Sequence, residues 1–182
     1  MRALGYMYKR VERRSEWLEA PGVVDIYSLS GCISEYFADY IKFWRHNGNW
    51  LFDSRASMTE FAAERQISLD GLKLFYYEAY ELEYDETKSS WVPWEPYDAI
   101  ATQVEEPSRK KLEGFDIATY SMHSSPECSP LSCNSCAETV HTNEHCLLES
   151  FDSAKLILES GGLGACEPGP YRIIAVYTVN DA

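Results

Sequence analysis

The residues best suited to chemistry lie in one segment, residues 123–146, which is rich in Cys and His. Thiolate and imidazole are the ligands that zinc prefers in a tetrahedral site. The cysteines follow the spacing C-x4-C-x2-C-x9-C, and the C-x2-C part could place two sulfur atoms on one metal. A structural zinc site usually has a second close pair, whereas the next His and Cys here are adjacent and make a poor chelate. The candidate zinc ligands are Cys128, Cys133, Cys136, Cys146 and His141.

The same segment has other chemical interpretations. Cys133 could be a nucleophile with His141 or His123 as its base. The C-x2-C pair could also be a redox dithiol at the start of a helix. The first three cysteines match an iron–sulfur spacing, but the fourth Cys of such sites usually lies far downstream. The simplest alternative is a loop of reduced cysteines that closes over the core, each buried as a small hydrophobic side chain.

The charge of the chain is strongly acidic and unevenly distributed. The net charge is −13, and residues 71–182 carry 19 acidic and seven basic side chains, whereas residues 1–70 are almost neutral. Such a field repels nucleic acid and anionic membranes and attracts basic proteins. We therefore expect a basic protein partner, with neither nucleic acid nor membrane as a partner. A surface that only keeps the protein soluble is the simpler alternative.

Acidic and aromatic residues alternate where this charge is densest, and nine acids accompany one Lys between residues 78 and 106. Tyr and Trp supply rigid apolar anchors at interfaces, and carboxylates supply steering and selectivity. Bacterial immunity proteins against nuclease toxins and DNA-mimicking inhibitors share this general character, although no motif of a named family is matched. Alternatively, the two Trp side chains pack beneath the hairpin. The candidate partner-binding residues are Glu81, Glu83, Asp85, Trp91, Trp94 and Asp98.

A long strand over residues 72–84 carries this surface, because apolar and aromatic residues alternate with period two. Both registers are apolar near residues 75–79, which predicts cover on both faces. Glu78 falls in the inward register, so its carboxylate is either functional or paired with a Tyr or with Arg172. Residues 85–90 predict a turn, and residues 91–95 predict a return strand at a sheet edge.

The remaining elements predict an α+β fold. Strands are expected at residues 4–11, 23–29, 115–122 and 171–179. Helices are expected at residues 33–46, at residues 53–66 with a capping box at residues 57–60, and at residues 151–159. Because strands and helices do not alternate strictly, we expect a single domain over residues 1–182, with a mostly antiparallel sheet and two or three helices packed on it.

The chain contains neither a bilayer-length apolar run nor a signal-peptide core, which favours a cytoplasmic protein with reduced cysteines. It also lacks the P-loop, G-x-G-x-x-G, H-E-x-x-H and G-x-S-x-G motifs. The sequence thus favours a non-catalytic, acidic binding protein of immunity-like or antitoxin-like character that needs no cofactor. The alternative is a small zinc-binding protein, or a Cys-dependent redox or hydrolytic protein, built on residues 128–146.

Overall fold

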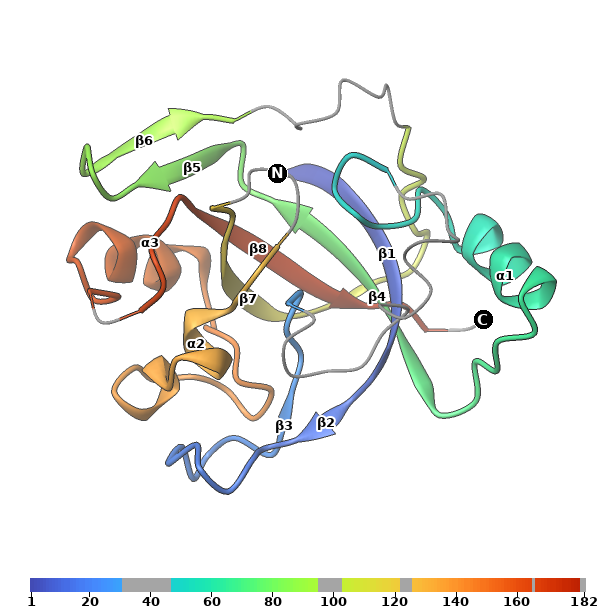
Figure 1. Cartoon of the computed structure of the whole chain (residues 1–182), viewed down its shortest axis with the longest axis horizontal. Coiled ribbons are helices and arrows are strands. Elements are labelled where there is room, and N and C mark those ends of the chain that lie inside the picture. Colours follow the sequence, from blue (N-terminus) through green and yellow to red (C-terminus); the bar gives the residue numbers. More distant parts are fainter. Residues whose placement is uncertain (31–46, 95–102, 122–125, 165, 181–182) are drawn as a thin grey trace.

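A computed structural model of the chain describes residues 1–30, 47–94, 103–121, 126–164 and 166–180. The predicted helix at residues 33–46 and the candidate residue Asp98 lie outside these ranges. The described residues confirm the α+β fold class, since they form an antiparallel sheet of six strands with helices packed at its two ends (Figure 1).

The six strands of the main sheet are β1 (Arg2–Arg10), β4 (Leu72–Ala79), β5 (Leu82–Asp85), β6 (Ser90–Pro93), β7 (Lys111–Thr119) and β8 (Tyr171–Thr178). The sheet is organised around its last strand, β8, which pairs with three others. β7 pairs along one side of β8, and β4 and then β5 pair along its other side. Beyond these strands, β1 pairs with β4, and β6 pairs with β5. β2 (Glu12–Arg13) and β3 (Asp25–Ile26) form a separate small ribbon.

The single long strand predicted over residues 72–84 is interrupted, and the prediction is corrected to two strands. β4 ends at Ala79, and β5 begins at Leu82. The backbone N–H of Tyr80 still donates to the carbonyl of Ile173 at 2.9 Å, so the chain keeps its contact with β8 across the interruption. The neighbour on the other side changes there from β1 to β6. The period-two alternation of the sequence continues across the point where the neighbouring strand changes, so it does not show that the strand is interrupted there.

The helices begin at serine caps. α1 (Arg55–Glu64) and α3 (Phe151–Glu159) follow Ser54 and Ser150, whose side chains accept backbone hydrogen bonds three residues ahead. The capping box predicted at residues 57–60 is wrong, because α1 has already begun. α2 (Pro130–Cys133) and the 3₁₀ turn η2 (Cys136–Glu138) join α3 at the end of the sheet opposite α1 (Figure 1). Within the described ranges, no helix is long and apolar enough to cross a membrane.

Both faces of β8 are covered, and apolar residues occupy both of its registers. Tyr171 and Ile173 belong to a core cluster with Ala154 and Leu158 of α3. Ile174 belongs to a second cluster, which contains the aromatic residues of β1 and β4. The two core clusters therefore share β8, and α3 packs in the same cluster as Tyr84 of β5.

Candidate functional site

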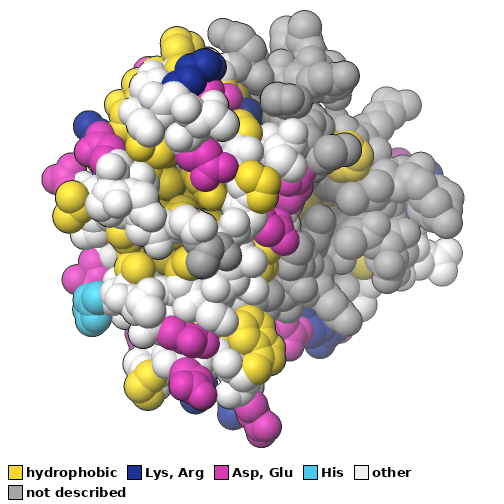
Figure 2. Space-filling model, turned by 60° about the vertical axis from the view of Figure 1, so that its left-hand side comes forward, with side chains coloured by type: hydrophobic (Ala, Val, Ile, Leu, Met, Phe, Trp, Pro, Cys, Tyr) yellow, Lys and Arg dark blue, Asp and Glu magenta, His cyan; other side chains and the backbone are white. Residues whose placement is uncertain are grey.

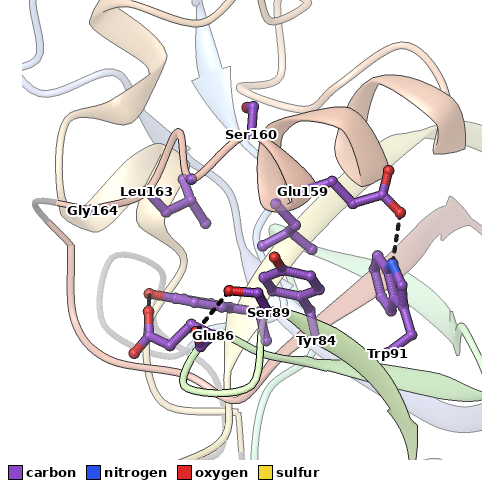
Figure 3. Close-up of a pocket in the computed structure, with 11 residues that line it drawn as sticks. Tyr84, Glu86, Ser89, Trp91, Glu159, Ser160, Leu163 and Gly164 are labelled. Atoms are coloured by element: carbon purple, nitrogen blue, oxygen red, sulfur yellow. Dashed lines mark hydrogen bonds between the residues drawn. The ribbon is translucent and has the colours of Figure 1, made fainter.

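A pocket of about 520 Å³ lies between the β5–β6 hairpin and the C-terminal end of α3 (Figure 3). The hairpin supplies aromatic and acidic side chains, α3 and the turn after it supply the opposite wall, and β8 supplies the base. The residues that line the pocket are Tyr84, Glu86, Ser89, Trp91, Leu158, Glu159, Ser160, Gly161, Leu163, Gly164 and Tyr171.

Two carboxylates mark opposite sides of this pocket. Oε1 of Glu86 accepts a hydrogen bond from the backbone N–H of Gly169 at 3.0 Å, and its Oε2 lies 3.2 Å from the hydroxyl of Tyr171. Oε1 of Glu159 accepts from Nε1 of Trp91 at 2.8 Å, so this contact joins α3 to the hairpin (Figure 3). Because burial and then the charge of Glu86 raise the pKa of Tyr171, its hydroxyl remains a neutral donor.

The pocket combines negative charge with aromatic surface. The rings of Tyr84 and Trp91 meet edge to face, with centroids 5.3 Å apart. None of the described residues that line the pocket is a Lys, Arg, His or Cys. Carboxylates and aromatic rings together attract cations, and a cation within about 6 Å of a ring gains further stabilisation. The arrangement can therefore hold a guanidinium or an ammonium group.

The predicted partner-binding residues lie in different environments. Glu81 is exposed between β4 and β5, and Trp91 lies at the pocket. Asp85 stabilises the hairpin turn, since it accepts hydrogen bonds from Thr87 and from Nζ of Lys88 at 2.6 Å. These hydrogen bonds, chiefly the one from Lys88, lower the pKa of Asp85 to about 2.

Glu83 and Trp94 contact Arg172, a buried residue of β8. Nε of Arg172 donates to Oε2 of Glu83 at 3.0 Å, and the guanidinium lies 3.8 Å from the ring centre of Trp94. The side chain of Glu83 is 14% exposed, and Trp94 is 3% exposed. Trp94 also donates through Nε1 to the carbonyl of Tyr80. Both side chains thus contribute to the interior of the protein and offer little surface to a partner.

Comparison of the chain with models of protein families, with curated proteins and with solved structures finds no match. The site is therefore interpreted from its own geometry.

The cysteines of residues 123–146 do not all converge on one point. Cys133 hydrogen-bonds with Cys128, which lowers the pKa of the Cys133 thiol to about 6 despite its burial, whereas Cys136 meets a cysteine outside this segment. Sγ of Cys133 lies 4.0 Å from Oγ of Ser30, whereas Sγ of Cys136 lies 2.6 Å from Sγ of Cys166. Cys128 and Cys146 are buried, and burial raises the pKa of the Cys146 thiol to about 12.

The histidines do not complete a metal site with these cysteines. The side chain of His141 is 85% exposed and lies 3.8 Å from Glu149, and His123 lies outside the described residues. His145 stacks on Tyr27 and contacts Asp25. Among the described residues, no three His, Cys, Asp or Glu side chains are placed to hold a metal ion. The zinc, iron–sulfur and Cys–His interpretations therefore gain no support from the geometry.

Glu78 is paired, as one of the two sequence-based alternatives predicts. Its Oε2 accepts from the hydroxyl of Tyr177 at 3.0 Å, and its Oε1 lies 2.5 Å from Nζ of Lys110. The predicted partner Arg172 binds Glu83 instead.

Five residues at the end of α3 and in the turn after it line the pocket but were not among the predicted site residues: Glu159, Ser160, Gly161, Leu163 and Gly164. The only sequence signals are the acidic end of a predicted helix and the glycines after it. Neither signal indicates that this end packs against the hairpin. Glu86 belongs to the predicted acidic segment, and its carboxylate is placed by the turn that Asp85 stabilises.

Proposed function

We propose that this protein binds a basic protein and that the pocket between the β5–β6 hairpin and α3 receives an Arg or Lys side chain of that partner. The observation that carries the proposal is the pairing of Glu86 and Glu159 with the aromatic walls of one pocket, in the absence of any Lys or Arg among the described lining residues. A cation in this pocket would contact carboxylate oxygens and ring faces together.

The surface around the pocket supports the same partner. Acidic side chains surround a recessed band of hydrophobic side chains on this end of the molecule (Figure 2). Surface charge of this kind accelerates encounter with a basic partner, and the aromatic side chains provide the anchoring contacts. The acidic binding protein is thus proposed to act as an immunity-like or antitoxin-like inhibitor, for which no cofactor is needed.

The charge of the chain also indicates which partners we do not expect. We expect the protein to bind neither nucleic acid nor anionic membranes, because a net charge of −13 repels polyanions. A cytoplasmic location is proposed separately and does not follow from the charge.

The first prediction tests the pocket with a defined probe, an arginine-rich peptide whose termini are blocked. The double substitution Glu86→Gln and Glu159→Gln should weaken peptide binding on the order of tenfold or more, because each change removes a charge-assisted contact. Calorimetry at low and high salt measures the affinity. Both carboxylates are exposed, so the unfolding free energy should change by less than about 1 kcal/mol.

A matched control carries the same charge change at a distant place. Glu60 and Glu64 are exposed on α1, at the opposite end of the sheet (Figure 1). Glu60→Gln with Glu64→Gln should weaken binding by no more than about twofold, because salt screens charges that far away. Equal weakening by both double variants, or none by the pocket variant, would show that the pocket does not select the cation.

A further inference from the structure

Two cysteines from separate parts of the chain meet beside the pocket. Cys136 is the first residue of η2, and Cys166 lies in the segment that follows α3. Their sulfur atoms are 2.6 Å apart, close to the roughly 2.05 Å of a disulfide bond. A bond between them needs only a small side-chain adjustment.

The surroundings of the cysteines favour this pair over the pair that the sequence suggests. Cys133 and Cys136 form the C-x2-C motif, yet the thiol of Cys133 contacts Cys128 and Ser30 rather than Cys136. Cys128 and Cys146 are almost fully buried, which shields them from reagents in solution. Cys166 is only half-buried, so of these two adjacent thiols it is the more accessible.

We propose that Cys136 and Cys166 form an intrachain disulfide by exchange with a low-molecular-weight disulfide such as oxidised glutathione, and that this bond fixes one wall of the pocket. The thiolate of Cys166 attacks the external disulfide, forms a mixed disulfide and releases one glutathione thiolate. The sulfur of Cys136 then attacks the sulfur of Cys166 and releases the second glutathione. The two protein thiols lose two protons and two electrons, and one glutathione disulfide is reduced to two thiols.

The bond would act on the pocket through the turn between α3 and Cys166. Leu163 and Gly164 line the pocket, and the backbone N–H of Cys166 donates to the carbonyl of Leu163 at 2.9 Å. A bond to Cys136 would attach this turn to η2, which packs on β7 and β8 through the same core cluster as α3. The wall would then keep its position before a partner arrives. The effect on binding rests on the proposed function of the pocket, whereas formation of the bond does not.

The second prediction concerns the bond itself. The intact protein is incubated with oxidised glutathione, its remaining thiols are alkylated, and its peptides are mapped by mass spectrometry. Two of the six thiols should be protected, and one peptide should join Cys136 to Cys166. The melting temperature of the oxidised protein should rise by about 5–10 °C, because the cross-link restricts the unfolded chain.

Three Cys→Ser substitutions test which cysteines form the bond. Cys133→Ser should leave the cross-link and its thermal effect unchanged. Cys136→Ser should leave Cys166 carrying glutathione, and Cys166→Ser should abolish both the cross-link and the rise in melting temperature. A peptide that joins Cys133 to Cys136 or to Cys128 in place of the expected one, or an oxidised protein without any intrachain cross-link, overturns the inference.

A peptide-binding measurement then separates this inference from the proposed function. The oxidised protein should bind the arginine-rich peptide roughly threefold more tightly or better, because a pre-positioned wall loses less conformational freedom on binding. An unchanged affinity overturns the effect on the pocket. If the bond forms but neither form binds the peptide, the proposed function fails while the disulfide assignment stands.

Discussion

Replacement of Arg172 by Met is expected to lower the free energy of unfolding by about 3–5 kcal/mol, because it breaks a buried ion pair on one side only. Arg172 is 3% exposed, and its Nε donates to Glu83 at 3.0 Å. Met has a similar length but no charge, so the carboxylate of Glu83 keeps its desolvation cost and loses its ionic partner. Urea unfolding at neutral pH measures the change.

Contacts with two aromatic rings add to the stability that Arg172→Met is expected to lose. The guanidinium lies between the rings of Trp94 and Tyr120, 3.8 Å and 3.9 Å from their centres. Burial raises the pKa of Tyr120 to about 12, so the ring remains neutral at physiological pH. Arg172→Lys is the informative companion variant, since Lys keeps the charge but cannot fill a planar space between two rings. It should recover part of the loss, about 1–2 kcal/mol.

A double-mutant cycle separates the energy of the ion pair between Arg172 and Glu83 from the energy of the packing around Arg172. Glu83→Gln combined with Arg172→Met leaves no buried charge, so the double variant should lose at least about 1.5 kcal/mol less than the sum of the single variants. Additive losses, or a loss below about 1 kcal/mol for Arg172→Met alone, would contradict this structural role. Glu83→Gln should also leave peptide binding of the folded protein unchanged, in contrast to the variants at Glu86 and Glu159.

Local patterns in the sequence predict the regular elements well. The helix at residues 151–159 agrees with α3, because Ser150 caps it and glycines follow its end. The strand at residues 171–179 agrees with β8, because only a central strand needs apolar residues in both registers. In both cases the physical cause lies within a few residues of the element.

The contacts of the site could not be predicted from local sequence patterns, because they join residues that are far apart in the chain. Glu83 alternates with apolar residues as a solvent-facing acid would, but its orientation is set by Arg172, 89 residues away. The C-x2-C spacing suggests a local pair, but Cys136 meets Cys166, 30 residues away. Tertiary packing selects one of several contacts that the local pattern permits.

Replacement of Asp116 by Ala is expected to lower the free energy of unfolding by about 4 kcal/mol, because it leaves four buried donors without their acceptor. Asp116 in β7 is fully buried. It accepts hydrogen bonds from the hydroxyl groups of Ser28 and Ser129 and from the backbone N–H groups of Leu29 and Ile117.

The loop that Asp116 holds is also bound from β1. Nζ of Lys9 donates to the carbonyls of Ser28 and Ser30. Loss of Asp116 therefore releases one of the two attachments of a loop that bridges β1 and β7. Asp116→Asn, which retains one acceptor oxygen, should lose about half as much as Asp116→Ala. Thermal and urea unfolding compare the two variants.

The pH dependence gives an independent check on the carboxylate of Asp116. Burial raises its pKa above the ordinary value despite the four donors. The unfolded chain therefore releases this proton at a lower pH than the folded protein does. The stability of the wild type relative to Asp116→Asn should fall as pH rises from about 4 through the folded-state pKa, and then become constant. Urea unfolding across this range measures the difference, and a relative stability that rises with pH would show that the donors outweigh burial.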